Sequence, residues 1–289
     1  MSIFKNIHLM STVSRKPFSI ISDNLPYSRK DSLQWYMKEE GFPDNFPLEL
    51  ISEALSEKES DSPAINYLKS LEKRKIFSVN KENPTAVVKG FLFDDSFSKK
   101  LIRHKLFAYD EATNLIIAKQ RGLPVPDVYA FAQLKKGIFC TKSLVAMEYL
   151  KGGTHPSDIF RGNIESHHAW ENVMDRVGKL ILRLYYAGCN HIDAHGYSFI
   201  IDDHDSDNDK IIDFQYAVFY DQPMPNILSH HLSFMVRRKL AHFDAEYLDN
   251  WARSILEEAG NLDVDKQFKL YKDMLNAKEL SSYKRMLFK

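Results

Sequence analysis

Two aspartates, Asp193 and Asp213, lie in the segment HIDAHGYSFIIDDHDSDNDKIIDF, which spans residues 191–214. Each lies beside a short apolar run, and an acidic turn joins the two runs. The runs are typical of two short strands, which would give both carboxylates a rigid mount. A carboxylate near a hydroxyl can take its proton, and one or two carboxylates commonly bind magnesium beside nucleotide phosphates. The spacing therefore indicates a base and a metal ligand, and the alternative is two aspartates that only cap turns or strand ends.

The same segment resembles the catalytic loop and the metal-binding segment of protein-kinase-like enzymes. HIDAHGYS is similar to the HxDxxxxN loop, and IIDF is similar to the DFG-type segment. The resemblance implies that Asp193 is the catalytic base and that Asp213 binds Mg²⁺. It also implies a second metal ligand at Ser198, where most relatives carry Asn, and Gln215 replaces the usual glycine after the phenylalanine.

A lysine and a glutamate upstream follow the order of the same family. Lys89, in AVVKGF, resembles the strand lysine that contacts the phosphates of ATP, and Glu111 resembles its ion-pair partner on a helix. The alternative is a solvated lysine and a solvated glutamate, and Lys81, Lys99 and Lys100 are competitors for the lysine.

The segment MEYLKGG resembles the connection between the two kinase lobes, whose backbone binds adenine, so Glu148 and Leu150 are implied to contact ATP. Met147 could equally be a core residue. The stretch between Phe77 and Lys89 has no glycine, so the close backbone approach to phosphate that glycine permits must be made otherwise.

The residue two after the base bears on the acceptor. His195 gives the pattern HxDxH, which resembles lipopolysaccharide core (Kdo/heptose) kinases and aminoglycoside phosphotransferase-like small-molecule kinases. The resemblance implies a catalytic His195 and transfer of the γ-phosphoryl group of ATP to a sugar or small-molecule hydroxyl. A core-sugar kinase is expected to have a basic face near its cleft, for which Arg237, Arg238 and Lys239 are the candidates, and the alternative for them is a solvated helix face. A lipid-linked acceptor would add a transient membrane-surface contact. The alternatives are a pseudokinase that acts as a scaffold and an effector-type kinase of protein hydroxyls.

The elements that must position these residues read as an α+β, two-lobed protein-kinase-like fold. Residues 76–150 are the expected small lobe, with strands at 76–79, 85–93, 123–134 and 142–150 and a helix at 107–122. Residues 151–289 are the expected helical large lobe. Its most regular apolar periodicity, at 167–188, predicts a helix that leads into the catalytic loop, and further helices are expected at 226–241, 244–259 and 264–287. Residues 1–75 are expected to be a helical extension, with helices at 31–40, 47–58 and 62–75.

The composition favours a globular protein without a nucleic-acid partner. The 289 residues include 39 basic and 39 acidic side chains, so no strong net field draws the molecule to nucleic acid. Cys140 and Cys189 show no metal-ligand spacing. No apolar run approaches the roughly 20 residues of a membrane helix, and no signal peptide is recognisable, so a cytoplasmic location is expected. The acidic turn 202–209 lacks the glycine and the final glutamate of a calcium loop, so it reads as a solvated hairpin turn.

Overall fold

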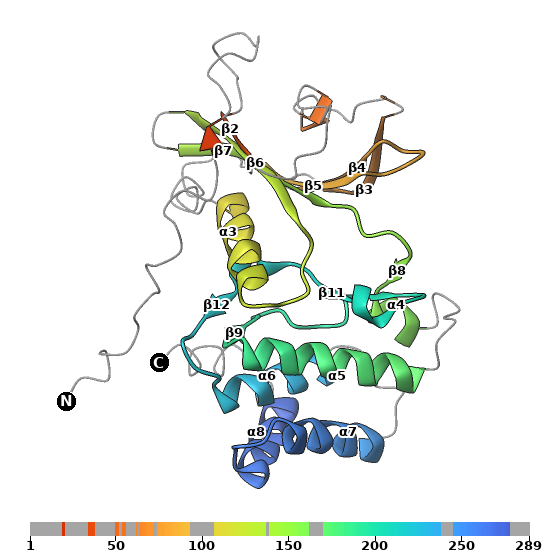
Figure 1. Ribbon diagram of the computed structural model, residues 1–289, viewed down its shortest axis with the longest axis vertical. Helices are drawn as coiled ribbons and strands as arrows, with labels where there is room; N and C mark the ends of the chain where they lie inside the picture. The colour runs from red at the N-terminus through yellow and green to blue at the C-terminus, as the bar shows by residue number, and fades with distance from the viewer. Residues whose placement is uncertain are drawn as a thin grey trace, which may run out of the picture. The chain divides into compact units, whose positions relative to one another are not determined.

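The computed structural model describes residues 19–20, 34–37, 50–51, 54–55, 62, 64–71, 74–92, 107–136, 139–161, 170–237 and 245–277 (Figure 1). These residues form two compact units. The sheet unit takes its described residues from 12–117 and 126–150, and the helical unit takes them from 118–125 and 151–289. The fold is α+β, and from residue 76 onward its strands and helices follow the order expected along the chain.

The sheet unit contains an antiparallel seven-stranded sheet with the order β1-β2-β6-β7-β5-β4-β3. Its strands are β1 (Ser19–Ile20), β2 (Gln34–Met37), β3 (Ile65–Leu71), β4 (Arg74–Val79), β5 (Ala86–Leu92), β6 (Val128–Lys136) and β7 (Phe139–Glu148). Strands β4 to β7 confirm the four predicted strands. Lys89 lies in β5 near the centre of the sheet, where it is paired with Ile76 of β4 and Val145 of β7.

The prediction of two of the helices within residues 1–75 is wrong. Residues 34–37, placed in a helix over 31–40, form β2, and residues 62–75 contribute β3 and the start of β4. Both β2 and β3 pair with strands of the main sheet, so this part of the chain adds strands to the sheet. Within the predicted helix 47–58, residues 50–51 and 54 are helical, and Ile51, Ala54 and Leu55 are fully buried in the apolar core cluster of the sheet unit.

Helix α3 (Phe107–Gln120) packs on the sheet through Tyr109, whose ring meets Phe131 of β6 at 5.5 Å between centroids. It confirms the predicted helix. On β5, a Cβ added to Gly90 would lie 2.1 Å from the Leu55 side chain. A side chain at position 90 would therefore require the Leu55 side chain to shift from its present position on the strand.

In the described part of the chain, the helical unit contains the last residues of α3 and five further α-helices, with three small strand pairings. The helices are α4 (Pro156–Phe160), α5 (Trp170–Tyr186), α6 (Pro225–Arg237), α7 (Ala245–Glu258) and α8 (Val264–Asn276). The strands are β8 (Gly153–Thr154), β9 (Cys189–Asn190), β10 (Phe199–Asp202), β11 (Lys210–Ile211) and β12 (Val218–Phe219). Strand β10 pairs with β11 and β8, and β12 pairs with β9. Helices α5 to α8 confirm the predicted helices, and β10 and β11 confirm the two short strands.

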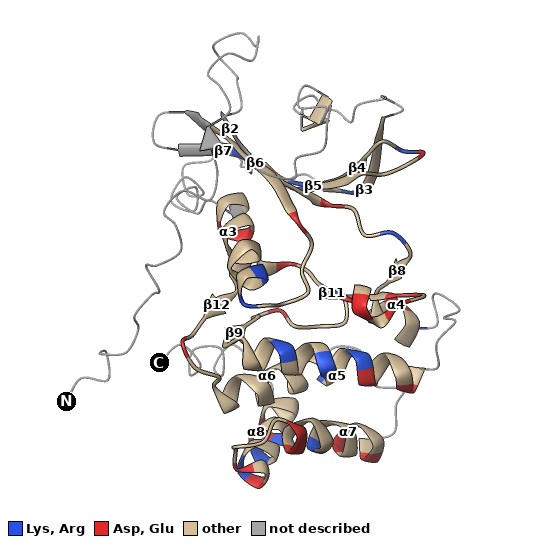
Figure 2. Cartoon of the chain, in the orientation of Figure 1, with Lys and Arg blue, Asp and Glu red and all other residues tan. Residues whose placement is uncertain are grey.

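Helix α5 is amphipathic, with ten buried residues facing the core of the unit. In Figure 2 the acidic residues of α5 are coloured red toward its N-terminal end, and its basic residues are coloured blue toward its C-terminal end. Glu171 and Asp175 thus lie near the positive end of the helix dipole, and Lys179 and Arg183 lie toward the negative end, which stabilises the helix. In the part of the chain that the structure describes, no helix is both long and apolar enough to span a membrane.

Candidate active site

The segment that carries both aspartates is closed by a two-stranded ribbon. Strand β9 leads directly into His191, and β12 follows Asp213, and the two strands pair in antiparallel register. Before β9, Gly188 ends α5 with φ +63, and a Cβ there would lie 2.4 Å from the Tyr220 carbonyl oxygen. Glycine is therefore required for the close approach of the two ends of the segment.

The loop that carries Asp193 is held by its own hydrogen bonds. The His195 amide donates to the Asp193 carbonyl at 2.7 Å, and the Ser198 amide donates to the His195 carbonyl at 2.7 Å. The Ser198 hydroxyl, which is fully buried, donates to the same Asp193 carbonyl at 2.5 Å. In this structure the Ser198 side chain therefore stabilises the loop around Asp193, and its predicted role as a metal ligand stays a prediction.

His191 links the catalytic loop to the Asp213 segment. Its buried ring donates from Nε2 to the Ile212 carbonyl at 2.8 Å, and it meets the Phe214 ring edge-on at 4.8 Å between centroids. Burial lowers the pKa of His191, while Asp213 and Asp193 both act to raise it. Both carboxylates therefore lie within electrostatic range of one imidazole.

Sequence reasoning did not include His191 among the site residues. Its position two residues before Asp193, at the end of an apolar helix and strand, was the available signal. A further contact could not be expected from the sequence, because the His191 amide donates at 3.1 Å to Nε2 of His231, which lies 40 residues later on α6.

Asp213 adopts a left-handed backbone conformation, with φ 71 and ψ 49. A non-glycine residue pays of order 1–3 kcal/mol for a sparsely populated conformation, so the surrounding structure must impose it. Contacts of the two neighbouring residues constrain the backbone of Asp213. The Ile212 amide donates to the Ser198 carbonyl at 2.8 Å, and the buried Phe214 ring stacks on Phe219 at 6.5 Å between centroids. The carboxylate is thus presented at the end of β11 by a fixed turn.

His195 is held in one orientation by the loop. The Tyr197 amide donates to His195 Nδ1 at 3.1 Å, so the neutral ring carries its proton on Nε2. Phe234 of α6 stacks on the ring at 6.1 Å between centroids. Tyr197 is fixed in turn, since its hydroxyl donates to Asp158 of α4 at 2.9 Å.

The donor set fits a magnesium ion bound together with nucleotide phosphates better than a cage made by the protein alone. Among the described residues, no group of three or more His, Cys, Asp or Glu side chains could hold a metal ion. Mg²⁺ usually keeps several waters and takes one or two carboxylates in addition to substrate phosphates. Asp213, fixed by its backbone, would supply such a carboxylate.

In the sheet unit, the structure brings Lys89 and Glu111 together. The Lys89 ammonium lies 2.7 Å from Oε1 of Glu111, and both side chains are buried, with 6% and 1% exposed. The predicted ion pair is confirmed, and binding of phosphates by Lys89 stays a prediction. Among the competitors, Lys81 is exposed in the turn 80–85 between β4 and β5, and Lys99 and Lys100 lie outside the described residues.

Two hydrogen bonds fix the end of β7, close to the last residue of the sheet unit. The Glu148 amide donates to the Asp127 carbonyl at 2.8 Å, and the Glu148 carboxylate accepts from the Asp127 amide at 3.1 Å. Leu150 follows as a half-buried residue without regular secondary structure. The predicted contact of Glu148 and Leu150 with adenine stays a prediction, and for Glu148 the backbone amide is already occupied.

The glycine-free turn before Lys89 spans residues 80–85 and is mostly exposed. Asn80 takes the left-handed conformation there, with φ 65, which asparagine tolerates better than most residues. An earlier hairpin joins β3 and β4, and its turn at 72–73 lies outside the described residues.

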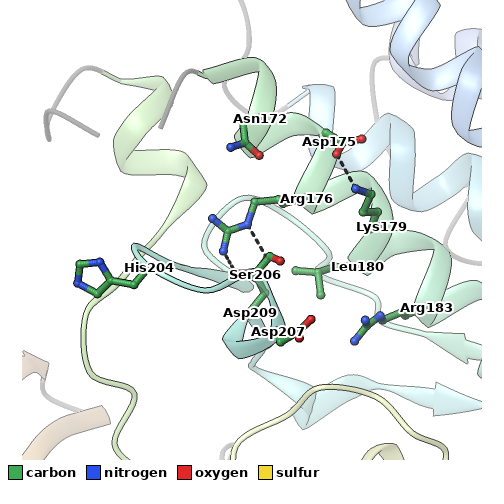
Figure 3. A pocket seen from close by; sticks show the side chains of 10 residues that line it. All are labelled: Asn172, Asp175, Arg176, Lys179, Leu180, Arg183, His204, Ser206, Asp207 and Asp209. Carbon is green, nitrogen blue, oxygen red and sulfur yellow. Dashed lines mark hydrogen bonds and ion pairs between the residues drawn. The ribbon is translucent and has the colours of Figure 1, made fainter. Parts of the chain in front are cut away.

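The acidic turn between β10 and β11 is anchored to α5. The buried Asp209 carboxylate pairs with Arg176, whose Nε donates at 2.9 Å and whose Nη2 also donates to the Asp202 carbonyl at 2.9 Å. The turn is a hairpin turn, as predicted, but one of its carboxylates is a buried structural partner. Figure 3 shows this contact in the wall of a pocket of about 410 Å³ between α5 and the turn.

The basic face proposed from the sequence is only partly described. Arg237 donates through Nη1 to the Met274 carbonyl at 3.5 Å and through Nη2 to the Ala277 carbonyl, so it closes the end of α8. Arg238 and Lys239 lie outside the described residues, as does the side chain of Cys140. Cys189 is buried at the start of β9, and burial raises the pKa of its thiol.

No protein-family model matches the chain, and no curated protein matches it. Among solved structures, it is similar to WaaP in complex with acyl carrier protein, at 15% identity and TM-score 0.49, over 73% of this chain and 89% of that chain. It is also similar to WbdD bound to a kinase inhibitor, at 17% identity and TM-score 0.49, over 77% of this chain and 48% of that chain. A second WbdD structure, described as a bifunctional kinase-methyltransferase, matches at 17% identity and TM-score 0.47, over 73% of this chain and 44% of that chain. The chain therefore spans about half the length of these WbdD chains.

Proposed function

We propose that the protein is an ATP- and Mg²⁺-dependent phosphotransferase that acts on a hydroxyl group, with a sugar hydroxyl as the preferred acceptor. The observation that carries the proposal is the arrangement around His191. One buried imidazole lies between the loop that bears Asp193 and the turn that presents Asp213, and both carboxylates act on its pKa. Such an arrangement would support a base, Asp193, and a metal-binding carboxylate, Asp213, on connected segments, as phosphoryl transfer requires.

In this mechanism Asp193 accepts a hydrogen bond from the acceptor hydroxyl and takes its proton. The acceptor oxygen bonds to the γ-phosphorus while the bond between that phosphorus and the β,γ-bridging oxygen breaks, so ADP leaves. Asp213 would hold Mg²⁺, which, when bound, neutralises charge on the phosphate oxygens. Lys89, fixed by Glu111 at 2.7 Å, would bind the nucleotide phosphates from the sheet unit. His195 would donate from Nε2 to an oxygen of the acceptor, which supports a polyhydroxylated substrate such as a sugar.

The buried position of Ser198 favours one alternative. If Ser198, whose buried hydroxyl donates to the Asp193 carbonyl, supplies no ligand, Asp213 would be the single protein ligand proposed for the metal. A pseudokinase that binds nucleotide without transferring phosphate would have the same feature.

Nucleotide binding and ATP turnover of the purified protein with Mg²⁺ separate these functions. The test compares wild type with Asp193→Asn and Asp213→Asn on a panel of sugar, small-molecule and protein acceptors. We expect Asp193→Asn to keep nucleotide binding and to lose turnover by roughly 10²- to 10⁴-fold, because only the base is removed. Asp213→Asn should lose the part of nucleotide affinity that depends on Mg²⁺.

Asp207→Asn is the matched control, because Asp207 is an exposed carboxylate of the hairpin turn in the same unit. Nucleotide binding without turnover on any acceptor would favour the pseudokinase. A folded wild-type protein that binds no nucleotide would rule out both functions.

A further inference from the structure

We infer that Arg121 is a positioning residue of the candidate active site, an inference that rests on the proposed function. Arg121 directly follows α3 and belongs to the helical unit. Its Nη1 donates to the Ala187 carbonyl at 2.7 Å and to the Tyr220 carbonyl at 2.6 Å. These carbonyls lie 66 and 99 residues further along the chain, so the contact is entirely tertiary.

The two carbonyls bracket the segment that carries the proposed chemistry. Ala187 ends α5 just before β9, and Tyr220 follows β12, so the chain between them contains Asp193 and Asp213. The ribbon of β9 and β12 joins the same two ends, and the Tyr220 amide donates to the Gly188 carbonyl at 2.8 Å. One guanidinium nitrogen with two hydrogens therefore holds both ends of the active-site segment together.

Two further contacts fix the guanidinium in this position. Its central carbon lies 5.2 Å from the centroid of the Phe219 ring, in the range of a cation–π contact. Its charge also lies at the C-terminal end of α5, where the helix dipole favours a cation. Three residues on, the Pro124 carbonyl accepts from the amide of Ile211 in β11 at 2.8 Å, so residues 121–124 hold the segment at a third point.

A change in this contact should move Asp193 and Asp213 relative to each other. The other groups proposed to bind nucleotide, which are Lys89, Glu111 and the end of β7, belong to the sheet unit and should keep their positions. Loss of the contact should therefore lower kcat by a larger factor than it raises KM for ATP. Removal of a distant positioning group can cost roughly 10²-fold in rate when it displaces a reacting group by about an ångström.

The test compares Arg121→Met, which removes the donors, with Arg121→Lys, which keeps the charge but lacks the planar fork. We expect kcat of Arg121→Met to fall on the order of 10- to 100-fold, with a smaller change in KM for ATP. Arg121→Lys should show a smaller loss of kcat. The matched control is Arg183→Met, which removes an exposed arginine of α5 in the same unit and should leave kcat unchanged.

Hydrogen exchange gives a readout that does not depend on activity. In Arg121→Met the amides of residues 189–193 and 212–220 should exchange faster, while those of β4 and β5 should not change. Arg121→Lys carries the test if Arg121→Met does not fold. Unchanged kcat in folded Arg121 variants, or unchanged exchange over these amides, would overturn the inference about Arg121 and leave the proposed function standing. A wild-type protein without turnover on any acceptor overturns the proposed function and with it the catalytic role of Arg121.

Discussion

His231 shows how a single buried side chain supports the catalytic loop. Its Nε2 accepts a hydrogen bond from the His191 amide, so a proton on this nitrogen would place a donor against a donor. Burial is the largest cause that lowers the pKa of His231 well below its usual value, and His230 and His191 lower it further. The neutral form of His231 is therefore part of the folded state.

This predicts a loss of stability on mild acidification. Above the ordinary histidine pKa of about 6.5, His231 is neutral in both the folded and the unfolded chain, and its titration contributes nothing. Below that pH the unfolded chain takes up a proton that the folded chain does not, so the free energy of unfolding falls by up to about 1.4 kcal/mol per pH unit. Urea unfolding between pH 7.5 and 5.5 measures this slope.

His231→Gln should reduce the slope by the contribution of about one proton taken up on unfolding, because glutamine does not titrate in this range. Glutamine also offers an acceptor near the position of Nε2. His204→Gln, at an exposed position of the same unit, is the control. A slope in His231→Gln equal to that of wild type would show that His231 is not the titrating group.

At the scale of elements, the buried pair Lys89–Glu111 joins α3 to the centre of the sheet. Removal of one partner leaves a buried charge without its counterion, and such changes cost about 3–5 kcal/mol, whereas apolar replacement of both partners is often neutral. We therefore expect Lys89→Met and Glu111→Leu each to destabilise the protein strongly and the double variant to recover most of the loss. Urea unfolding of the three variants measures the coupling.

Nucleotide binding then separates the structural role of this pair from its proposed function. If Lys89 binds phosphates, the double variant should regain stability without regaining affinity for ATP. A stable double variant that binds ATP as wild type does would contradict the role proposed for Lys89.

The elements that sequence analysis predicted correctly are those whose pattern is local. The apolar periodicity of α5 and the short runs of β10 and β11 appear in the sequence without knowledge of their partners. The errors at 31–40 and 62–75 have a different cause. The β3 segment is rich in residues that also favour helices, and it is a strand because it pairs with β4 at the edge of the sheet.

The residues of the candidate site also divide into those predicted from the local sequence and those that depend on distant partners. Asp193 and Asp213 stand out by spacing, whereas Arg121 meets carbonyls 66 and 99 residues away and Arg176 meets Asp209 33 residues away. Such partners follow from the tertiary fold. Trp35 and Tyr36 in β2 were an available signal that was not used, because bulky aromatic residues favour strands.

At the scale of the whole molecule, the chain passes between the two units more than once. Residues 118–125 belong to the helical unit, although the chain on both sides of them belongs to the sheet unit. Helix α3 is continuous across this boundary, so the helix that carries Glu111 leads directly to Arg121. The chain therefore passes from one unit to the other within α3 and again at residue 150.

Two buried leucines on either side of the boundary test this division. Leu115, 1% exposed, belongs to the sheet unit, and Leu123, 4% exposed, belongs to the helical unit. Leu→Ala at a buried site costs about 2–5 kcal/mol, so both variants should be destabilised to a similar degree. Hydrogen exchange should differ between them, because local openings follow cooperative parts of a structure. We expect Leu115→Ala to lower protection in β4 to β7, and Leu123→Ala to lower it in β9, β11 and β12. The same pattern of exchange in both variants would show that the two units open together. In that case Leu123→Ala should reduce nucleotide binding as strongly as it reduces turnover.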